Sequence, residues 1–336
     1  MKHRILVVTD RIDPHADRLI TVLRKHAAEP LRLNISEVPI SATLAFALDK
    51  DTWAGEGRLA TNGRVLDTRD LTSVWWRRPG WYTFPSDMQA QEQEFASEET
   101  DHCLSGIWSA LDCYWVSHPE NIRRASYKIE QLQRAVRLGF EVPRTVVTTS
   151  PDTARAFFDE CDGQMVYKVL SDPFLSARHL LRRGHPDPIR IRAVVTTQIT
   201  PDTLHLLDSV RSVPCLFQEL IRKRSDLRVT VIGSEVFAVE IFLQEHEDDC
   251  TDHRGHGPGS RYRAVRLPDE LAARCVELTR SYGLNFSAID LLRTDDGRDV
   301  FMEINPNGQF LHLQERLPEL RLDDAMAACL IRGGNG

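Results

Sequence analysis

The sequence predicts an α/β protein with an N-terminal open α/β domain, a central α+β lobe and a C-terminal lobe built on an antiparallel sheet. The chain has 336 residues, more than a single hydrophobic core usually serves. An apolar strand at residues 4–9 is followed by an amphipathic helix from Pro14, as in open α/β domains. Near the C-terminus two apolar runs flank Asp296-Gly297, which is the pattern of a β-hairpin.

Composition limits the classes of function. The chain is 42% hydrophobic and 27% charged, with a net charge of −7, so it lacks the basic surplus with which nucleic-acid binders displace counterions. It contains neither an apolar run of the ~20 residues that a membrane helix needs nor a signal-peptide core. The seven cysteines form no C-x-x-C pair, which fits free thiols in a reducing compartment. We therefore expect a cytoplasmic protein that binds neither nucleic acid nor membrane.

Residues 1–118 are expected to form the N-terminal domain. After the first strand and helix, a strand is predicted at 71–76, a long helix at 87–112 and a strand at 114–117. A turn is expected at Pro119. The apolar members of the long helix are Phe95, Leu104, Ile107, Trp108 and Leu111.

Residues 119–217 are expected to form the central lobe. A helix is predicted from Ser126, its N-cap, to Leu138. Its apolar stripe consists of Ile129, Leu132 and Val136. The other expected elements are strands at 142–148 and 164–170, a helix between them at 151–160, a β-rich segment at 190–197 and a helix at 201–211.

Residues 218–336 are expected to form the C-terminal lobe. A polar, glycine-rich segment at 244–263 interrupts its regular elements. Those elements are a β-rich segment at 229–243, a helix at 268–282, a hairpin at 286–305 and a last helix from about residue 321.

The hairpin carries the most informative pattern. With Asp296-Gly297 as a two-residue turn, counting outward places Asp290 directly opposite Glu303. Directly opposed residues project from one face, and Asn305, two residues further along, projects there too. Three oxygen-bearing side chains, two of them anionic, then converge. Oxygen ligands select Mg²⁺ or Mn²⁺ rather than zinc.

The alternative is a solvated hairpin with unrelated acidic residues. Asp290 and Glu303 both lie within apolar runs that are expected to be buried, where an unpaired charge is costly. The metal site is therefore the preferred interpretation.

Two lysines and one strand end are further candidates for ligand binding. Lys128 lies in the first turn of the central helix, and Lys168 lies in an apolar strand. Either lysine is a phosphate clamp or an ordinary edge lysine whose stem covers apolar surface. Residues 218–221 end another apolar strand, and their backbone offers donors and acceptors to an adenine.

Taken together, these motifs resemble the ATP-grasp superfamily. The sequence has no P-loop, no G-x-G-x-x-G, no H-E-x-x-H and no G-x-S-x-G. The resemblance covers about residues 118–310, and its pattern is closest to the ribosomal-protein glutamate ligase type. The sequence segments at 74–79, 124–128 and 139–145 are similar to those of the graspetide synthetases, the ATP-grasp peptide maturases that include the microviridin ligases. The motif residues are, in order, Lys128, Lys168, Gln218, Glu219, Ile221, Asp226, Arg228, Asp290, Glu303 and Asn305.

The resemblance implies an ATP-grasp fold and an ADP-producing carboxylate ligase. Such an enzyme phosphorylates an Asp or Glu side chain of a ribosomal precursor peptide. A Ser or Thr hydroxyl, or a Lys amine, of the same peptide then closes an ester or amide ring. ATP and two Mg²⁺ ions, with Mn²⁺ as an alternative, are the implied cofactors. The implied partners are the leader and core of the precursor peptide and a second copy of the chain in a homodimer.

Residue roles are carried over from the family motifs. The implied nucleotide set is Lys128 and Lys168 for the phosphates, Gln218, Glu219, Leu220 and Ile221 for the adenine (through the backbone of Glu219 and Leu220), and Asp226 for the ribose. The implied metal ligands are Asp290, Glu303 and Asn305. Arg228 and Arg254 are expected to stabilise the acyl phosphate.

Peptide contacts are less specific in the sequence. The leader-binding hairpin and helix of the family correspond to residues 190–213, where Asp208 and Arg211 either pair with leader charges or are ordinary surface residues. Arg78 is a candidate for the substrate carboxylate. The sequence departs from the superfamily at 171–178, which lacks the glycines of the usual phosphate-covering loop.

Three competing interpretations differ from this one. Histidines, a cysteine and an aspartate at 246–256 suggest zinc, but their spacing matches no standard site, so a substrate-side loop is preferred. A related ligase would add amino acids to a protein or to a small carboxylate. An ATP-binding regulator without turnover would need a damaged metal set, which the sequence does not have. A neighbouring reading frame for a short peptide rich in Thr, Ser, Glu and Asp would favour the ring-forming ligase.

Overall fold

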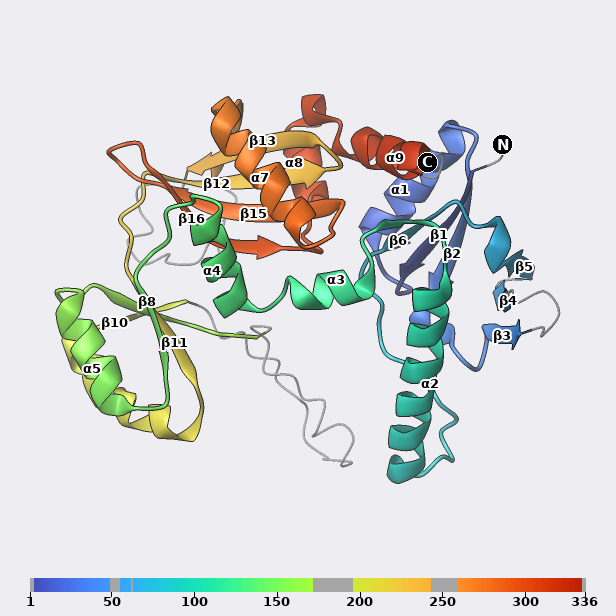
Figure 1. Cartoon of the computed structure of the whole chain (residues 1–336), viewed down its shortest axis with the longest axis horizontal. Coiled ribbons are helices and arrows are strands. Elements are labelled where there is room, and N and C mark those ends of the chain that lie inside the picture. Colours follow the sequence, from blue (N-terminus) through green and yellow to red (C-terminus); the bar gives the residue numbers. More distant parts are fainter. Residues whose placement is uncertain (1–2, 49–54, 62, 172–195, 243–258, 334–336) are drawn as a thin grey trace.

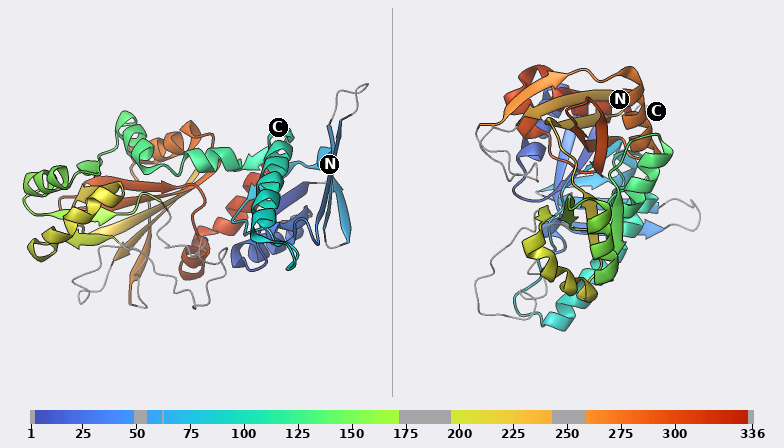
Figure 2. Two further views of the ribbon diagram at one scale, coloured as in Figure 1. Left: turned by 90° about the horizontal axis from the view of Figure 1, so that it is seen from below. Right: turned by 90° about the vertical axis from the view of Figure 1, so that its left-hand side faces the viewer.

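The computed structural model describes residues 3–48, 55–61, 63–171, 196–242 and 259–333 (Figure 1). It consists of an N-terminal parallel α/β domain, a central lobe with an antiparallel sheet and a C-terminal lobe with a larger antiparallel sheet. The predicted fold class is confirmed. Figure 2 shows the N-terminal domain at one end of the molecule and the central lobe at the other, with the C-terminal sheet between them.

The N-terminal domain is built on a parallel sheet of strand order β2-β1-β6-β7. Along β1, Ile5 and Val7 face one core and Leu6 and Val8 face the other, because successive side chains of a strand point to opposite faces. The elements are β1 (Arg4–Thr9), α1 (Pro14–Lys25), β2 (Glu29–Asn34), β6 (Ser73–Trp76), α2 (Ala90–Ala110) and β7 (Tyr114–Val116).

A small antiparallel sheet in this domain was missed by the sequence prediction. It consists of β3 (Thr43–Leu48), β4 (Gly55–Thr61) and β5 (Arg64–Asp67), flanked by the short helices η1 (Ile35–Glu37) and η2 (Thr68–Asp70). Strand β3 is almost wholly exposed, although its residues Leu44-Ala-Phe-Ala-Leu48 are apolar.

Helix α2 also differs from its prediction. Phe95 is 65% exposed, whereas Leu104, Ile107 and Trp108 are buried against the sheet. Figure 1 shows that the first half of α2 projects beyond the sheet, which explains why only the second half has a buried face.

The central lobe has a four-stranded antiparallel sheet of order β10-β9-β11-β8. Helix α5 and the 3₁₀ helix η3 pack together on one face of this sheet. The elements are α3 (Pro119–Arg124), α4 (Lys128–Arg137), β8 (Thr145–Thr148), α5 (Pro151–Glu160), β9 (Met165–Lys168), β10 (Thr197–Ile199), η3 (Pro201–Ser212) and β11 (Cys215–Glu219).

Three predictions for the start of this lobe are wrong. Pro119 begins helix α3 instead of a turn, as proline does readily at a first helical position. Ser126 does not cap α4, because its hydroxyl donates to the Ile122 carbonyl at 2.8 Å. Ile129 and Val136 are about half exposed, at 49% and 54%. The face of α4 that packs on β16 is formed by Gln131, Leu132 and Ala135.

The C-terminal lobe is a five-stranded antiparallel sheet of order β14-β13-β12-β15-β16. Helix α7 and part of α4 cover one face, and α8 and α9 cover part of the other. The elements are β12 (Ser225–Ile232), β13 (Glu235–Phe242), β14 (Arg261–Val265), α7 (Asp269–Ser281), β15 (Phe286–Arg293), β16 (Asp299–Asn305), α8 (Leu311–Arg316), η5 (Pro318–Leu320) and α9 (Leu322–Gly333).

The last helix links the two ends of the chain. Met326 and Leu330 of α9 share a core with Ile5 and Val7 of β1, and Arg18 of α1 forms an ion pair with Asp323 at 2.6 Å. Figure 1 shows α9 beside α1. The N-terminal and C-terminal lobes are therefore packed into one continuous core. Among the described helices, none is long and apolar enough to cross a membrane.

Candidate active site

The predicted metal ligands lie on the β15–β16 hairpin, where Asp290 pairs with Glu303. The predicted two-residue turn is wrong. The Thr294 amide donates to the Arg298 carbonyl at 3.0 Å, so three residues form the loop, with Gly297 at φ +85°. A three-residue loop with a residue in the left-handed region is the next common hairpin type.

A β-bulge corrects the register before it reaches the site. Counting from the observed loop alone, Met302 would lie opposite Asp290. The ladder shifts by one residue between Asp290 and Leu291, which leaves Met302 without a partner on β15 and brings Glu303 opposite Asp290. The predicted pairing is therefore correct, although it arises from two compensating offsets.

Asp290 is neutralised by Arg228, its direct partner on the neighbouring strand β12. The Arg228 Nη1 atom lies 2.7 Å from each carboxylate oxygen of Asp290. Asp290 is only 7% exposed, and burial of a carboxylate is costly unless a counter-charge is present. The residue expected to stabilise the acyl phosphate therefore contacts a predicted metal ligand.

Lys128, the first residue of α4, reaches the same place from the central lobe. Its Nζ lies 3.5 Å from Oε2 of Glu303 and donates to the Val169 carbonyl at 2.8 Å. Lys168 is the last residue of β9, adjacent to Val169, and pairs with Leu216 of β11. The two predicted phosphate lysines thus lie where the central sheet meets β16.

Gln131, one turn further along α4, fixes that strand and was not singled out from the sequence. Its side-chain amide donates to the Ile304 carbonyl at 2.9 Å and accepts from the Ile304 amide at 3.2 Å. Ile304 lies between Glu303 and Asn305, and Gln131 is 3% exposed. A glutamine in an apolar helical stripe is the signal that could have identified it.

The donor set suits a hard divalent cation. The Asn305 amide oxygen accepts a hydrogen bond from the Asn307 amide at 3.0 Å, which orients that oxygen. Among the described residues, no group of three or more His, Cys, Asp or Glu side chains is arranged to hold a metal ion by itself. Two carboxylates and one amide oxygen would leave the remaining coordination positions of the ion to water and phosphate oxygens, which is the usual arrangement for Mg²⁺.

The predicted adenine segment follows β11. The Glu219 amide donates to the Arg144 carbonyl at 3.0 Å, and the Leu220 amide donates to the Gln164 carbonyl at 2.9 Å. The described residues supply no acceptor for the Ile221 amide. The groups left for a base are consequently the carbonyl oxygens of this segment and the Ile221 amide.

A cavity of about 320 Å³ adjoins this segment. It is lined by Leu220, Ile221, Arg222, Thr294, Asp295, Asp296 and Arg298. Asp226, predicted to bind ribose, is buried and accepts from Lys223 Nζ at 2.8 Å. Gln218 is buried, and its side-chain amide donates to the Thr145 hydroxyl at 3.0 Å.

The predicted peptide contacts come from other elements, η3 and the segment after β6. Asp208 and Arg211 are on η3, and Asp208 accepts from Arg155 of α5 at 3.0 Å, which lowers the pKa of its carboxyl group. Arg78 follows β6 and is exposed. Arg254 and residues 190–195 lie outside the described residues. A larger cavity of about 980 Å³, along α2, contains none of the predicted residues.

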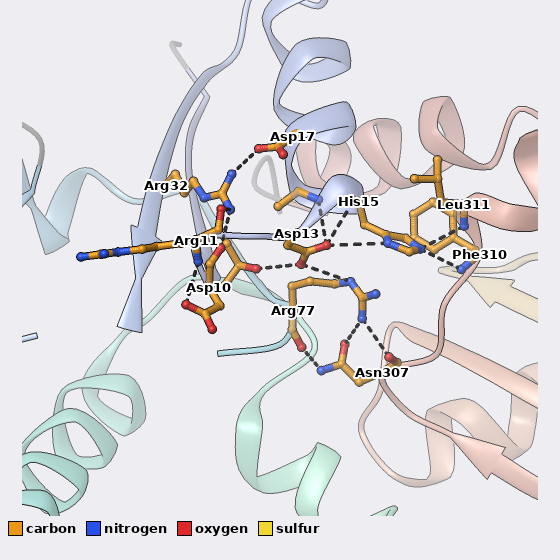
Figure 3. A network of polar contacts seen from close by, with 12 residues as sticks. Asp10, Arg11, Asp13, His15, Asp17, Arg32, Arg77, Asn307, Phe310 and Leu311 are labelled. Atoms are coloured by element: carbon orange, nitrogen blue, oxygen red, sulfur yellow. Dashed lines mark hydrogen bonds and ion pairs between the residues drawn. The ribbon is translucent and has the colours of Figure 1, made fainter. Parts of the chain in front are cut away.

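A buried polar network joins the N-terminal domain to the loop that follows β16 (Figure 3). Arg77 Nη1 donates to the Asn307 carbonyl at 3.0 Å, and Arg77 Nε lies 3.7 Å from Oδ2 of Asp13. Nε2 of His15 accepts from the Phe310 and Leu311 amides at 3.2 and 3.0 Å. None of these residues was predicted as a site residue, since the contacts from Arg77 and His15 to the loop after β16 join residues more than 200 positions apart.

The charge states in this network follow from burial. Burial, helped by the positive charge of Arg77, lowers the pKa of His15 to about 3, so its imidazole is neutral. Burial also lowers the pKa of Arg77 to about 10, which still leaves the guanidinium charged at neutral pH. Neutral His15 accepts at Nε2, so its proton is on Nδ1, which lies 3.7 Å from Asp13.

Comparison with known proteins agrees with this architecture. Residues 4–123 match the family model of the MvdD pre-ATP-grasp domain. A probable alpha-L-glutamate ligase from Pectobacterium carotovorum is 26% identical over 58% of this chain and 59% of its own length. The matched region thus spans about three fifths of such curated relatives.

Solved structures match nearly the whole chain. The macrocyclase MdnC from Microcystis aeruginosa, bound with precursor peptide MdnA, superposes with a TM-score of 0.84 at 26% identity and covers 98% of this chain and 99% of MdnC. A RiPP-associated ATP-grasp ligase from Chryseobacterium gregarium, in complex with ADP and a leader and core peptide, has a TM-score of 0.88 at 27% identity, with 98% and 97% covered. The chain therefore has the ATP-grasp fold. Its first domain is an MvdD pre-ATP-grasp domain.

Proposed function

We propose that this protein is an ATP-dependent peptide ligase that closes side-chain rings in a ribosomal precursor peptide and releases ADP and phosphate. The observation that carries the proposal is the convergence of Asp290, Glu303 and Lys128 at the β15–β16 hairpin. The likeness to a macrocyclase and to a RiPP-associated ligase over 98% of the chain supports the peptide as substrate.

In the first step, an Asp or Glu carboxylate of the peptide attacks the γ-phosphorus of ATP and ADP leaves. We assign Lys128 and Lys168 to the phosphates, as point charges. Asp290, Glu303 and Asn305 would hold two Mg²⁺ ions, or Mn²⁺, which would neutralise phosphate charge. Charge neutralisation and alignment of two anions are the whole requirement, so the protein needs no nucleophile of its own.

In the second step, a Ser or Thr hydroxyl, or a Lys amine, attacks the acyl carbon of the mixed anhydride. The bond between that carbon and the phosphate oxygen breaks, phosphate leaves and the nucleophile loses its proton. We assign Arg228 and Arg254 to the negative charge on the acyl phosphate. Arg228 would exchange part of its contact with Asp290 for the phosphate when a metal ion neutralises that carboxylate.

The adenine is assigned to residues 218–221 and the ribose to Asp226. The Ile221 amide, which has no acceptor among the described residues, suits a ring nitrogen, and a neighbouring carbonyl suits the exocyclic amine. The leader of the peptide is assigned to residues 190–213, with Asp208 and Arg211 as charged contacts, and the substrate carboxylate to Arg78. We further propose that the enzyme is cytoplasmic and homodimeric.

The test is incubation of the protein with a precursor peptide from a neighbouring reading frame, ATP and Mg²⁺. Mass spectrometry should show the loss of one water per ring, with one ADP formed for each bond. Mild base then separates esters, which open, from amides, which persist. A peptide of unchanged mass in the presence of ADP release would contradict ring closure.

The alternative is a glutamate-ligase-like enzyme that adds amino acids to a carboxylate. The curated ligases support it, but they match only 58% of the chain, while the macrocyclase matches 98%. A product heavier by amino-acid residues would establish the alternative instead.

A further inference from the structure

The loop that follows β16 links that strand to the N-terminal domain. Asn307 donates its backbone amide to the Asn305 amide oxygen at 3.0 Å, which makes a local turn that orients a predicted metal ligand. Four residues later the chain enters α8 (Leu311–Arg316). The position of Asn307 therefore determines where the Asn305 oxygen points.

Side chains of the N-terminal domain hold this loop. Arg77 donates to the Asn307 carbonyl at 3.0 Å, and the Asn307 side-chain amide donates back to the Arg77 carbonyl. His15 accepts the amides of Phe310 and Leu311. Figure 3 shows both side chains pointing from the N-terminal domain onto the loop.

Arg77 is an unusual residue for a position that is 2% exposed. Its counter-ion, Asp13, caps α1 through the His15 and Ala16 amides and accepts from the Thr9 hydroxyl at 2.7 Å. Replacement of a buried ion pair by apolar residues of similar volume is often neutral or stabilising. Stability alone therefore does not account for Arg77, whereas its directional bond to Asn307 does.

On its other side, the loop is packed closely against β15 and Arg228 at Gly308. A Cβ added at Gly308 would lie 2.4 Å from Cβ of Ala288 and 2.7 Å from Nη2 of Arg228. Arg228 in turn holds Asp290. A displacement of the loop would consequently disturb Asn305 and the partner of Asp290 together.

We propose that Arg77 is a positioning residue that sets the affinity of the site for its divalent cation, by holding Asn307 and through it Asn305. This inference rests on the proposed function, because it takes Asn305 as a metal ligand. It adds that the N-terminal domain, besides any contact with the peptide, supports the metal site through the contact of Arg77 with Asn307.

The test compares Arg77→Lys with Arg18→Lys. Both substitutions retain the positive charge next to a buried aspartate, but Arg18 joins α1 to Asp323 and does not touch the loop. Binding of Mn²⁺ to the protein–ADP complex is measured by electron paramagnetic resonance of the free ion, and ADP binding by calorimetry over a range of Mg²⁺ concentrations. Thermal unfolding of each variant is recorded without metal.

Arg77→Lys should raise the Mn²⁺ and Mg²⁺ concentrations for half-saturation by about tenfold or more, as loss of an outer-shell partner commonly does. Excess Mg²⁺ should restore ADP affinity to the wild-type value. Arg18→Lys should leave both half-saturation concentrations unchanged. Should Arg77→Lys fail to fold, Asn307→Ala serves as the second variant, with a smaller increase in the same direction.

Two negative results have different meanings. If the wild-type protein binds no Mn²⁺ with ADP, the proposed function itself fails. The other negative result is that the wild type binds Mn²⁺ and ADP, while Arg77→Lys and Asn307→Ala have the wild-type metal concentrations for half-saturation and lose only thermal stability. In that case Arg77 is a structural residue, and this inference alone is overturned.

Discussion

Asp290 and Glu303 are paired across one hairpin, yet their surroundings differ. Asp290 is 7% exposed and held by Arg228 at 2.7 Å, while the Glu303 side chain is 31% exposed and 3.5 Å from Lys128. Removal of one partner of a buried pair leaves an uncompensated charge, whereas an ion pair that is partly exposed to solvent contributes less. The same chemical change should therefore have different consequences at the two positions.

We expect both Asp290→Asn and Glu303→Gln to reduce ADP release by more than the roughly 10–100-fold that loss of an outer-shell residue causes. In urea unfolding, Asp290→Asn should also lower the free energy of unfolding by about 3 kcal/mol, because Arg228 loses its carboxylate. Glu303→Gln should leave stability nearly unchanged. Wild-type turnover in the Glu303 variant would remove this residue from the metal set.

His15 makes a second prediction, concerning pH. Burial lowers its folded-state pKa to about 3, with further lowering by Arg77, Arg78 and His312 and an opposing effect of Asp13. Below its unfolded pKa of about 6.5, only the unfolded chain binds the proton, so stability must fall as pH decreases from there toward 3.

Between about pH 7 and pH 5, the wild type should lose about 2 kcal/mol more unfolding free energy than His15→Gln, which retains an acceptor for the Phe310 and Leu311 amides. Urea unfolding at both pH values measures this difference. Equal losses in the two proteins would show that His15 takes up its proton in the folded state as readily as in the unfolded one.

At the scale of elements, two local features of the β15–β16 hairpin, its loop and a bulge, together determine which residues are paired. Asp296-Gly297 marks the turn correctly, but the loop has three residues, with Gly297 in the left-handed region. The bulge at Met302 then restores the pairing of Asp290 with Glu303. A bulge has no reliable sequence signature at an apolar residue, so the sequence alone could not reveal the correction.

Helix α4 holds strand β16 through Gln131. Gln131→Leu would keep the volume of the side chain but leave the amide and carbonyl of Ile304, a residue 1% exposed, without partners. We expect a loss of about 2–4 kcal/mol in unfolding free energy and weaker binding of ADP with Mg²⁺. Calorimetry and urea unfolding provide the two measurements.

Gln133→Leu is the matched control, since Gln133 lies on the exposed face of the same helix. Its unfolding free energy should change by less than about 0.5 kcal/mol, with nucleotide binding retained. Comparable losses in the two variants would mean that the Ile304 hydrogen bonds contribute nothing specific.

At the scale of the whole molecule, the first and last elements form one core. Met326 of α9 is fully buried with Ile5 of β1 and Phe286 of β15. Met326→Ala should lower the unfolding free energy by about 2–4 kcal/mol. Calorimetry should show one transition moving to lower temperature. A variant in which only one lobe melts earlier would show that the N-terminal domain and the C-terminal sheet unfold independently.

The sequence by itself determined the α/β class, the likeness to the ATP-grasp superfamily, the hairpin and the pairing of Asp290 with Glu303. The class and the hairpin depend on the pattern of apolar residues and on turn residues, which act over short distances along the chain, and the likeness depends on the order and spacing of motif residues, which can be read from the sequence alone. The superfamily and the fold are confirmed, while the roles of the individual site residues stay predictions.

Only the tertiary structure decided which faces are buried and which distant groups meet. Ile129 and Val136 fit an apolar stripe, yet α4 buries Gln131, because the exposed edge of β16 needs hydrogen bonds there. Arg77 and Asn307 lie 230 positions apart and are joined inside the protein. Such contacts follow from how complete lobes pack against each other, and no local pattern in the sequence encodes that geometry.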